Sequence, residues 1–442
     1  MSVRVRFAPS PTGQVHIGNI RAAIFNWLYA RHTCGAFLLR VEDTDRERST
    51  PEAIRTLLDV MEWLGMSSDE PPVYQSARTA RHLEVAAAMV AAGTAYRENR
   101  DGKGECVVCR MPKTGHVEYT DAVKGRIRKQ AEDTQDFIIV RSDGTPVFHL
   151  ANVVDDHDMG ITHVIRGDDH VENTFKHLQI FRAMGVEPPV YAHLPMIVNH
   201  MGKPYSKRDG AAFVGDFQAQ GFLPEALFNF LALLGWAPGD DREILSRDEM
   251  VAAFDLDRCK SSAARFDIKK LVWMNGEYLR RLPRGTIDGV FRDRLAAAGL
   301  DPAAVADETW KAVLDLMIPR TKIFSEVPGN CAFFFTEEYA FDPKAVEKRL
   351  RPAGALDLLR QVAELFDGLP EFTAEATEHA LRAFGEARNI GMGAMVHPVR
   401  VAVSGSGEGP GLFEMLALLG RKRVCARLRG AERALAGHAP VA

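Results

Sequence analysis

Hydrophobic and polar positions at the start of the chain predict alternating strands and a helix. Residues 3–7 alternate as a strand does, and a stretch with prolines and a glycine, residues 8–13, ends it. Apolar side chains then recur at helical spacing over residues 19–31. Residues 36–41 form a short apolar run typical of a buried parallel strand. Strand, loop, helix and strand make a βαβ unit, so we predict an open α/β sheet.

The pattern changes twice further along the chain. Residues 49–52, Ser-Thr-Pro-Glu, read as a helix start with a hydroxyl N-cap, and Gly65 is expected to end that helix. Between 97 and 150 the pattern becomes β-like and irregular, and from 151 to 200 it returns to α/β. An inserted subdomain inside one α/β domain explains that order.

Helical patterns dominate the last third of the chain. Strand signals thin from about residue 215. One apolar stripe runs from Leu356 to Phe366 and stops at Gly368, and a second runs through Val424, Leu428 and Leu435. Basic residues flank the second stripe: Arg421, Lys422, Arg423, Arg427 and Arg429. We therefore predict an α-helical domain with at least one basic face.

Composition narrows the class of protein without indicating an activity. The chain has 442 residues, too many for one ordinary core, so two to four domains are expected. Hydrophobic content of 46% and charged content of 26% are those of a soluble globular protein. The formal net charge of -4 argues against a uniformly basic nucleic-acid coat but permits a local basic face.

Cysteine usage and the absence of long apolar runs indicate a cytoplasmic protein. The six cysteines lie mostly apart, as reduced thiols do, rather than as a disulfide framework. Residues 1–30 hold no basic region followed by a long apolar run, and no apolar run reaches the roughly 18 residues of a membrane span. We expect neither a signal peptide nor a membrane helix.

Two loops carry residue types suited to phosphate chemistry. The first, residues 9–19 or PSPTGQVHIGN, lies between the first strand and the first helix, where backbone N–H groups and the helix dipole favour an anion. Gly18 permits close approach to the backbone, and His16 can donate to phosphate oxygens. Taken alone, the loop could equally be a capped helix with a surface histidine.

The second loop, residues 202–210 or GKPYSKRDG, places flexible cations and a hydroxyl between glycines. Such side chains can neutralise charge that builds on a phosphoryl group. By itself this segment could be a solvated turn. The occurrence of both loops, in this order, at the two ends of one α/β region favours a shared phosphate site.

Together the two loops resemble the signature pair of class I aminoacyl-tRNA synthetases. Residues 16–19, HIGN, match the family's "HIGH" motif, and residues 203–208 match its "KMSKS" motif. Further words are similar to those of bacterial glutamyl-tRNA synthetases: RFAPSPTG at 6–13, EDTD at 42–45, VVDD at 153–156, VIRGDDH at 164–170 and WMNG at 273–276. The similarity extends to residues 398–402 and 411–414, so it covers nearly the whole chain.

The resemblance implies an α/β fold with a Rossmann-type class I catalytic domain, an inserted α+β acceptor-binding subdomain, and an α-helical anticodon-binding domain. The expected boundaries are 1–96 and 151–215 for the two catalytic halves, with the KMSKS-like loop in the second. The insertion is expected at 97–150, or as far as 190. A helical stem-contact region at 216–310 and an anticodon-binding domain at 311–442 complete the chain.

The resemblance also implies a two-step reaction. The α-carboxylate of L-glutamate attacks the α-phosphorus of ATP and releases pyrophosphate, and a ribose hydroxyl of the 3' adenosine of tRNA(Glu) then attacks the glutamyl-adenylate. Both steps need in-line geometry and charge stabilisation more than an acid or base. His16 and Lys207 are the implied catalytic residues, with Lys207 on the departing pyrophosphate and Mg²⁺ on the triphosphate. The other implied ATP-binding residues are Gly18, Asn19, Asp169, Lys203 and Ser206.

A glutamate pocket needs cations for the side-chain carboxylate and an anion for the α-ammonium group. Arg6 and Arg166 are the matching arginines, and an arginine fork suits a carboxylate. Glu42 is the matching anion. The remaining implied pocket residues are Ala8, Ser10, Phe148 and Asn152. The alternative is that Arg6, Arg166 and Glu42 form ordinary ion pairs.

Two positions depart from the family pattern. Phe148 stands where the family usually has tyrosine, and a lost hydroxyl bond to a charged ligand would cost about 1.5–3 kcal/mol unless water replaces it. Pro204 stands where the first lysine of the KMSKS motif falls, and Lys203 is displaced by one residue. Because proline fixes φ, we expect a stiffer loop whose chemistry rests on Lys207, with Lys203 auxiliary.

A zinc site is not expected. Cys106 and Cys109 form a Cys-x-x-Cys pair, but no second pair follows and His116 would supply only a third ligand. Some relatives carry a longer insertion with a zinc knuckle, and here only residues 97–105 precede the pair. The resemblance instead aligns residues 106–110 with a strand.

The implied partners are tRNA(Glu), L-glutamate and ATP with Mg²⁺, and relatives are commonly monomeric. Candidate RNA contacts in the helical third are Arg320, Lys322, Arg400, Arg421, Lys422 and Arg423, each of which could also be an ordinary surface charge.

Four alternatives to this function stay open. The first is a non-discriminating enzyme that also charges tRNA(Gln). The second is a glutamyl transferase that modifies queuosine in a tRNA, which would lack the helical third. The third is a glutaminyl-tRNA synthetase, whose carboxy-terminal domain is usually of β-barrel type. The fourth is a non-catalytic tRNA-binding paralogue.

Overall fold

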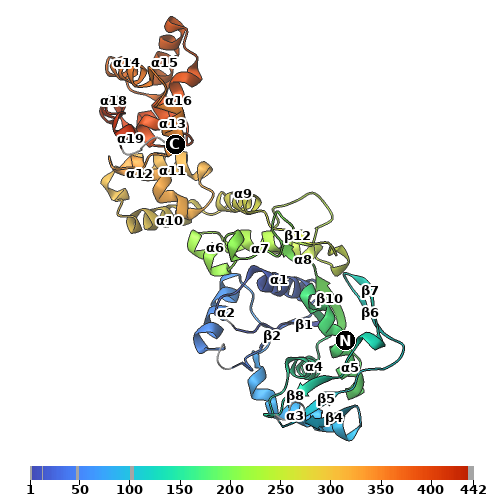
Figure 1. Cartoon of the computed structure of the whole chain (residues 1–442). Helices are drawn as coiled ribbons and strands as arrows, with labels where there is room; N and C mark the ends of the chain where they lie inside the picture. The colour runs from blue at the N-terminus through green and yellow to red at the C-terminus, as the bar shows by residue number, and fades with distance from the viewer. Residues whose placement is uncertain (1, 12, 46–48, 100–103, 437–442) are drawn as a thin grey trace. The chain divides into compact units, whose positions relative to one another are not determined.

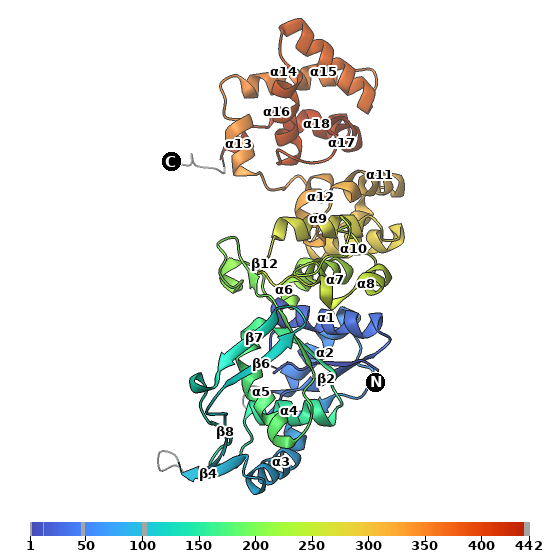
Figure 2. The same ribbon diagram turned by 90° about the vertical axis from the view of Figure 1, so that its right-hand side faces the viewer.

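The computed structural model describes residues 2–11, 13–45, 49–99 and 104–436 (Figures 1 and 2). Its internal packing divides the chain into two units, Met1–Met274 and Asn275–Ala442. The strands of the described residues all belong to the first unit, and the second unit is helical. No helix among the described residues is long and apolar enough to cross a membrane.

Parallel strands form the centre of the first unit. β1 (Arg4–Phe7), β2 (Ala36–Val41) and β3 (Val73–Tyr74) pair in that order. β9 (His163–Gly167) and β10 (Val190–Leu194) form a second parallel pair. The backbone N–H of Thr162 donates to the carbonyl of Arg4 at 2.9 Å, which joins the start of β9 to β1. The chain therefore winds outward in two directions from β1 and β9, the arrangement of a doubly wound sheet.

The first two helices follow from the sequence pattern. The helix expected over residues 19–31 is α1 (Ile17–His32), and most of its residues are buried, including Ile20, Ile24 and Leu28. The next is α2 (Pro51–Trp63), whose N-cap Thr50 accepts a hydrogen bond from the backbone N–H of Ala53 at 3.2 Å. The predicted hydroxyl cap is confirmed, and the chain leaves the helix through Gly65 at φ +65°.

The β-rich segment forms a small sheet of its own and one extension of the central strands. After α3 (Thr79–Ala91), an antiparallel sheet runs in the order β4-β5-β8. Its strands are β4 (Ala95–Asn99), β5 (Glu105–Cys109) and β8 (Phe137–Val140). The hairpin of β6 (His116–Asp121) and β7 (Gly125–Gln130) lies between β5 and β8 in sequence, and β6 pairs in parallel with β10. The hairpin thereby extends the sheet of β9 and β10.

A shared core fixes the small sheet to the helices that follow it. Ile139, Leu150, Val154 and Ile180 are fully buried in one cluster with residues of β5 and α3. Leu150 and Val154 come from α4 (Phe148–Asp158), and Ile180 comes from α5 (Val171–Met184). In both views β4, β8 and α3 lie at one end of the first unit, with α6, α7 and α8 at the other (Figures 1 and 2).

Short elements complete the first unit. A two-stranded parallel pair joins β11 (Ile197–Val198) to β12 (Ala264–Arg265). The helices are α6 (Val214–Gln220), α7 (Pro224–Ala232), α8 (Arg247–Ala253) and α9 (Ile268–Leu279), the last of which ends in the second unit.

The second unit contains α10 to α19 among its described residues. Their bounds are α10 (Arg284–Ala297), α11 (Asp307–Met317), α12 (Val327–Phe335), α13 (Pro343–Arg349), α14 (Ala355–Asp367), α15 (Ala374–Arg388), α16 (Met392–Ser404), α17 (Leu412–Leu419), α18 (Arg421–Arg429) and α19 (Arg433–Ala436). The first predicted stripe is α14, which packs against α18. The second stripe is two helices rather than one, because α18 ends at Gly430, a residue with low helix propensity.

Candidate active site

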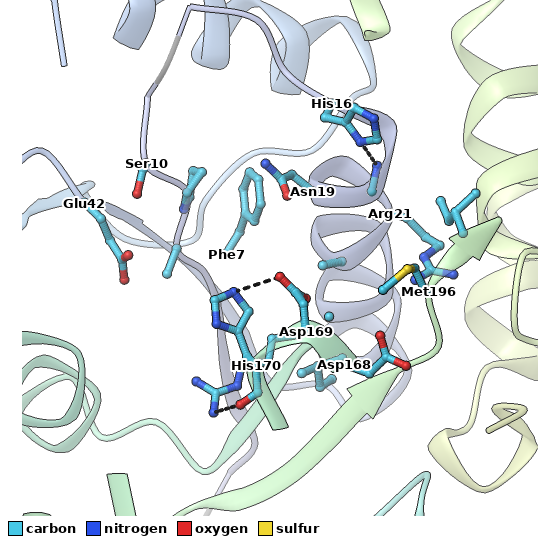
Figure 3. Close-up of a pocket in the computed structure, with 18 of the residues that line it drawn as sticks. Phe7, Ser10, His16, Asn19, Arg21, Glu42, Asp168, Asp169, His170 and Met196 are labelled. Atoms are coloured by element: carbon cyan, nitrogen blue, oxygen red, sulfur yellow. Dashed lines mark hydrogen bonds and ion pairs between the residues drawn. The ribbon is translucent and has the colours of Figure 1, made fainter. Parts of the chain in front are cut away.

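A cavity of about 500 Å³ opens at the carboxyl ends of the parallel strands (Figure 3). Its wall includes residues 8–10 after β1, Glu42 after β2, residues 167–170 at the end of β9 and residues 195–197 after β10. The backbone N–H of Glu42 donates to the carbonyl of Pro9 at 3.0 Å and holds the first two loops together. Ligands of doubly wound folds bind in this crevice, where the strand order reverses.

His16 caps the helix that borders the cavity. It is the N-cap of α1, and its Nδ1 accepts a hydrogen bond from the backbone N–H of Gly18 at 3.0 Å. The proton of a neutral ring is therefore on Nε2. Burial lowers the pKa of His16, and a backbone hydrogen bond with Tyr205 opposes that shift. A Cβ on Gly18 would lie 3.2 Å from Nδ1 of His16, a close contact that the glycine avoids.

The GKPYSKRDG loop is braced by hydrogen bonds of its own. Asp209 accepts from the backbone N–H of Ser206 at 3.0 Å and from Nδ2 of Asn199 at 2.7 Å. Pro204 lies opposite Val198 in an isolated β-bridge, and the next N–H, that of Tyr205, donates to the carbonyl of Ile197 at 3.0 Å. Proline is tolerated here because the neighbouring residue makes the backbone bond.

An aromatic ring lies between the two signature loops. The ammonium of Lys207 lies 5.7 Å from the ring centroid of Phe213, and that ring meets His16 edge-on at 5.8 Å. His16 and Phe213 also form an antiparallel backbone bridge, with the N–H of Ile17 donating to Ala212 at 3.0 Å. Lys207 is exposed and has no carboxylate partner among the residues the structure describes. Phe213 was not singled out from the sequence.

A buried charge network forms one side of the cavity. Arg6 donates to Asp156 through Nε at 2.9 Å and Nη2 at 3.3 Å, and Arg40 donates to the same carboxylate at 2.5 Å. Oε1 of Glu42 accepts from Arg40 Nη2 at 3.2 Å and from Asn152 Nδ2 at 2.9 Å. Burial would raise the pKa of Asp156, but Arg40 and Arg6 outweigh it and lower that pKa.

Two acceptors of this network are left without a donor. Oε2 of Glu42 has no hydrogen-bond partner among the described residues, and Oδ1 of Asn152 is buried without one. Burial raises the pKa of Glu42, although Arg40 and Arg6 oppose the shift. Buried polar atoms are nearly always paired, and both residues line the cavity, so a ligand donor can supply the missing partner of Oε2 of Glu42, whereas Oδ1 of Asn152 is itself shielded from solvent.

Arg166, another residue of the cavity wall, is held by four groups. Its Nε donates to Nε2 of His193 at 3.2 Å and its Nη1 to Nδ1 of His177 at 3.3 Å. Its Nη2 donates to the carbonyl of His170 at 3.2 Å and to Oγ1 of Thr174 at 2.7 Å. An arginine has five N–H groups, so these contacts leave one, on Nη1. Burial lowers the pKa of Arg166.

Phe148 begins α4 and contacts histidines instead of a hydroxyl partner. Its ring is 6.1 Å from that of His170 and 5.7 Å from that of His177. His177 and His149 share a hydrogen bond of 3.2 Å, and burial lowers the pKa of His149 to about 4. These rings are therefore neutral at pH 7, and Phe148 packs against an uncharged aromatic cluster.

Most of the residues predicted for the site line this one cavity. They are Arg6, Ala8, Ser10, His16, Gly18, Asn19, Glu42, Phe148, Asn152, Arg166 and Asp169. Figure 3 shows Glu42 and Ser10 facing the cavity from one side and His16, Asn19 and Arg21 from the side of α1. Lys203, Ser206 and Lys207 are not part of the wall, to which their loop contributes Pro204 and Tyr205.

Sequence reasoning missed several wall residues, including Arg21, His170, Met196 and Tyr205. Arg21 donates to the carbonyls of Leu234 and Pro195, and burial lowers its pKa to about 10. The signal for Arg21 was present, because a charged residue occurs on the apolar face of the helix, four residues after Ile17. No comparable signal marked Met196 or Tyr205.

The cysteine pair lies in a strand. Cys106 and Cys109 belong to β5 and are buried, and Sγ of Cys106 contacts the carbonyl of Glu98 at 3.2 Å. His116 lies in a different strand, β6. Across the described parts of the chain, no three His, Cys, Asp or Glu residues are grouped closely enough to hold a metal ion.

The basic face predicted for the second unit is largely occupied. Arg427 is buried and donates to Glu337 and to the carbonyls of Val403 and Phe333, and Arg423 also donates to Glu337. Arg400 donates to the carbonyl of Pro410 at 2.6 Å. Exposed candidate cations with no side-chain partner among the described residues are Arg320, Lys322 and Lys422.

The chain matches two protein families that together define one class of enzyme. The family "tRNA synthetases class I (E and Q), catalytic domain" matches residues 2–103 and 97–273, and the family "Anticodon binding domain" matches residues 291–432. The chain is therefore a class I aminoacyl-tRNA synthetase, an α/β catalytic domain followed by a helical anticodon-binding domain.

Curated relatives and solved structures narrow the class. The chain is 44% identical to "Glutamate--tRNA ligase 1" of Gluconacetobacter diazotrophicus, over 97% of this chain and 99% of the relative. It is 41% identical to the protein of the same name from Acidithiobacillus ferrooxidans, over 98% of this chain and 99% of the relative. A crystal structure of a glutamate tRNA ligase from Elizabethkingia meningosepticum, in complex with its amino acid, has a TM-score of 0.78 at 30% identity and covers 98% of this chain and 100% of that one. The chain belongs to the glutamate–tRNA ligase family.

Proposed function

We propose that this chain activates L-glutamate with ATP and transfers it to the 3' adenosine of tRNA(Glu). The observation that carries the proposal is the unpaired acceptor Oε2 of Glu42, beside Asn152, in a cavity that Arg6 and Arg166 also line. An α-amino acid with a second carboxylate has one cation and two anions. The cavity offers acceptors for the cation on one side and guanidinium donors for the anions.

The ammonium group is assigned to Glu42 and Asn152. Both open oxygens are acceptors, and both residues line the cavity. The other partner of the Glu42 carboxylate, Arg40, is fully buried and meets this carboxylate only at Oε1. A ligand ammonium therefore meets Oε2 without displacing a protein contact.

The glutamate side-chain carboxylate is assigned to Arg166 with Arg6. Arg166 has one N–H left on Nη1, and Nη1 of Arg6 makes no hydrogen bond within the described residues. The side-chain carboxylate thus receives two single donors from two fixed arginines, rather than a fork from one. A glutamine amide in the same place would oppose an NH₂ group to a guanidinium, so the arrangement favours glutamate.

ATP is assigned to the part of the cavity bordered by α1. His16 and the helix N-terminus are assigned to the phosphates. Lys207, held near Phe213, is assigned to the departing pyrophosphate, with Ser206 and Lys203 as auxiliary contacts of the same loop. Asn19 and Asp169 lie in the wall toward the nucleoside. Mg²⁺ enters as part of the substrate MgATP, since triphosphate oxygens are its preferred ligands.

The rest of the chain is assigned to RNA. We propose residues 97–150, or as far as 190, as the acceptor-binding insertion between catalytic halves 1–96 and 151–215. Residues 216–310 are proposed to contact the tRNA stem and residues 311–442 to bind the anticodon. We further propose a cytoplasmic monomer. Salt-dependent affinity is expected from backbone contacts by the exposed cations.

The test is pyrophosphate exchange with glutamate and ATP, with and without tRNA. We expect exchange that depends on tRNA, as the family resemblance implies. Absence of exchange under either condition, in a protein that still binds tRNA, would favour the non-catalytic paralogue. Aminoacylation of purified tRNA(Glu) and tRNA(Gln) then separates a discriminating enzyme from a non-discriminating one.

A further inference from the structure

A chain of three buried side chains runs from the inserted hairpin to the cavity. Asp121 ends β6, His193 lies in β10, and Arg166 lies opposite His193 in the register of β9 and β10. Their exposed fractions are 2%, 0% and 7%. Asp121 and His193 do not line the cavity, whereas Arg166 does. The first two therefore act on a ligand only through the third.

The hydrogen bonds of this chain determine where the imidazole proton lies. Arg166 can only donate, so Nε2 of His193, 3.2 Å from Nε of Arg166, must accept. A neutral imidazole then carries its proton on Nδ1. That nitrogen lies 2.6 Å from Oδ2 of Asp121 and donates to the carboxylate. Burial lowers the pKa of His193, in agreement with a neutral ring.

Asp121 is fixed by the turn that follows it. Its Oδ1 accepts from the backbone N–H groups of Val123 at 3.0 Å, Lys124 at 2.9 Å and His193 at 3.2 Å. Burial would raise the pKa of Asp121, but the bonds to His193 and Lys124 outweigh it and lower that pKa. A charged carboxylate held by three N–H groups is a rigid acceptor for the imidazole.

The same geometry selects which face of Arg166 meets a ligand. The Nε edge is bound by His193, Nη2 is bound by Thr174 and the carbonyl of His170, and Tyr191 lies 5.2 Å below the guanidinium. Thr174 also lies 3.1 Å from Nε2 of His193, so one cluster holds the whole Nε side. The one N–H that stays unbound is on Nη1.

We infer that His193 and Asp121 are positioning residues that fix the Arg166 guanidinium so that its Nη1 meets the side-chain carboxylate of glutamate. This inference deepens the proposed function and rests on it for the identity of the ligand. It makes the inserted hairpin part of amino-acid selection, because Asp121 comes from that hairpin. Loss of the imidazole acceptor leaves the Nε edge unpaired and loosens the guanidinium against His177, Thr174 and the carbonyl of His170, which weakens glutamate binding without touching the ATP side.

The experiment compares two buried Asp–His pairs of the same chain. His193→Phe removes the acceptor and keeps a ring, and His193→Gln returns an acceptor near the position of Nε2. The control is His82→Phe, because His82 is also fully buried and bonded to a carboxylate, Asp155 at 2.8 Å, but does not contact Arg166. KM for glutamate and for ATP is measured by exchange with tRNA present, and folding is followed by thermal unfolding.

We expect His193→Phe to raise KM for glutamate at least tenfold with KM for ATP within twofold of wild type, and His193→Gln to recover most of the loss. His82→Phe should lower the unfolding temperature with KM for glutamate within twofold. A folded His193→Phe with unchanged KM for glutamate, or with both KM values raised together, overturns the inference. If His193→Phe does not fold, Asp121→Asn takes its place, with an expected rise in KM for glutamate of at least threefold and the same criterion.

A measurement without turnover separates this inference from the proposed function. Nitrogen-15 NMR of histidine-labelled protein at pH 7 should show His193 as the neutral Nδ1–H form, assigned by its absence in His193→Gln. An imidazolium or an Nε2–H form overturns the inference whatever the activity. Wild-type protein that shows the Nδ1–H form but no glutamate-dependent exchange would refute the proposed function and leave the positioning of Arg166 in place.

Discussion

At the scale of single residues, the site is defined by which hydrogen-bonding atoms stay open. Glu42 uses one carboxylate oxygen for Arg40 and Asn152 and keeps the other toward the cavity. Arg166 uses all of its donors but one. Under the proposed function, single atoms of fixed side chains contact the amino acid, so the role of each atom can be tested by one substitution.

Glu42→Gln replaces the open oxygen by either a neutral oxygen or an NH₂ group. We expect KM for glutamate to rise about ten- to a hundredfold, because a hydrogen bond to a charged group contributes about 1.5–3 kcal/mol. KM for ATP should stay within twofold. Steady-state exchange kinetics measure both, with Glu70→Gln as control, since Glu70 forms an exposed pair with Arg4. Equal loss for the two substrates would contradict the assignment.

Individual site residues could be predicted from the sequence only where they lie in a motif of the resembled family. Arg6, Glu42 and Arg166 lie in such motifs, and all three line the cavity. Their partners could not be predicted, because Asp156 and Arg40 meet Arg6 and Glu42 only once the strand order is known. The hydrogen bonds of Arg166 with two histidines and a threonine could not be predicted either, because they depend on the pairing of β9 with β10.

At the scale of elements, the segment that follows the second signature loop connects this loop to the first. Phe213 pairs with His16 in the bridge and lies between His16 and the ammonium of Lys207. Pro204 replaces the first lysine of the KMSKS motif, and Lys207 of the same loop lies near an aromatic ring. Neither contact could be predicted, because the loops are nearly 200 residues apart in the chain.

Lys207→Ala should lower the rate of adenylation and leave tRNA affinity nearly unchanged, because the ammonium is assigned to the pyrophosphate. A single-turnover assay of adenylate formation and a tRNA-binding titration measure the two effects. Arg208→Ala is the matched control, since Arg208 is an exposed cation next in the chain. Unchanged adenylation in Lys207→Ala would refute the pyrophosphate contact.

Phe213→Leu removes the ring that faces Lys207 and should slow adenylation by about two- to fivefold, because a cation–π contact at an exposed site contributes about 0.5–1 kcal/mol. Phe213→Tyr keeps the ring and should keep the rate. The same single-turnover assay measures the rate of adenylation, and the unfolding temperature shows whether packing is preserved. If leucine and tyrosine behaved alike, the ring would have no role in orienting Lys207.

In the second unit, Glu337 connects α18 to the segment after α12. Hydrogen bonds from Arg427 and Arg423 lower its pKa to about 2. Because the folded pKa lies below the unfolded one, the stabilisation is present above the unfolded pKa, about 4.3, and is lost as pH falls toward 2.

Glu337→Gln should therefore lower the unfolding temperature at pH 7 and make the difference from wild type smaller at pH 4. The carboxylate is half exposed, so we expect a modest effect. Circular dichroism melts at the two pH values measure it, and Glu378→Gln, in an exposed helical pair with Arg382, is the control. A difference from wild type that stayed constant between the two pH values would contradict the pKa assignment.

Helices and strands with strong periodicity could be predicted, and their boundaries depended on capping and turn residues. The stripe at 356–366 became one helix, α14. The stripe through Val424 and Leu435 became two, since its apolar spacing continues past the break at Gly430. Periodicity reports which face is buried and not whether the backbone is continuous.

At the scale of the whole molecule, the sequence did not show which basic residues of the helical unit are already paired. Arg423, Arg427 and Arg429 all contact acidic groups of the same unit. A count of charges cannot distinguish such internal pairs from a binding face, because the same residue types make both. Among the candidates named from the sequence, Arg320, Lys322 and Lys422 are exposed and available to a phosphate backbone.

Lys322→Ala should raise KM for tRNA and reduce the slope of log affinity against log salt by about 0.7–0.9, the value for one lost phosphate contact. Its unfolding temperature should not change. Arg423→Ala should lower the unfolding temperature and leave the salt slope unchanged, since it removes bonds to Glu337 and to the carbonyl of Phe334. Filter binding across a salt series measures the slopes, and equal slopes for wild type and Lys322→Ala would exclude Lys322 from the interface.

The unpaired oxygen of Glu42 connects ligand affinity to the stability of the empty enzyme. Burial raises the pKa of this carboxyl group, so its charge destabilises the folded state, and under the proposed function a ligand ammonium offsets part of that cost when it binds. The catalytic unit is then held below its maximal stability at the atom proposed to recognise its substrate. Mutations selected only for a higher unfolding temperature should therefore tend to remove this charge and weaken the enzyme for glutamate.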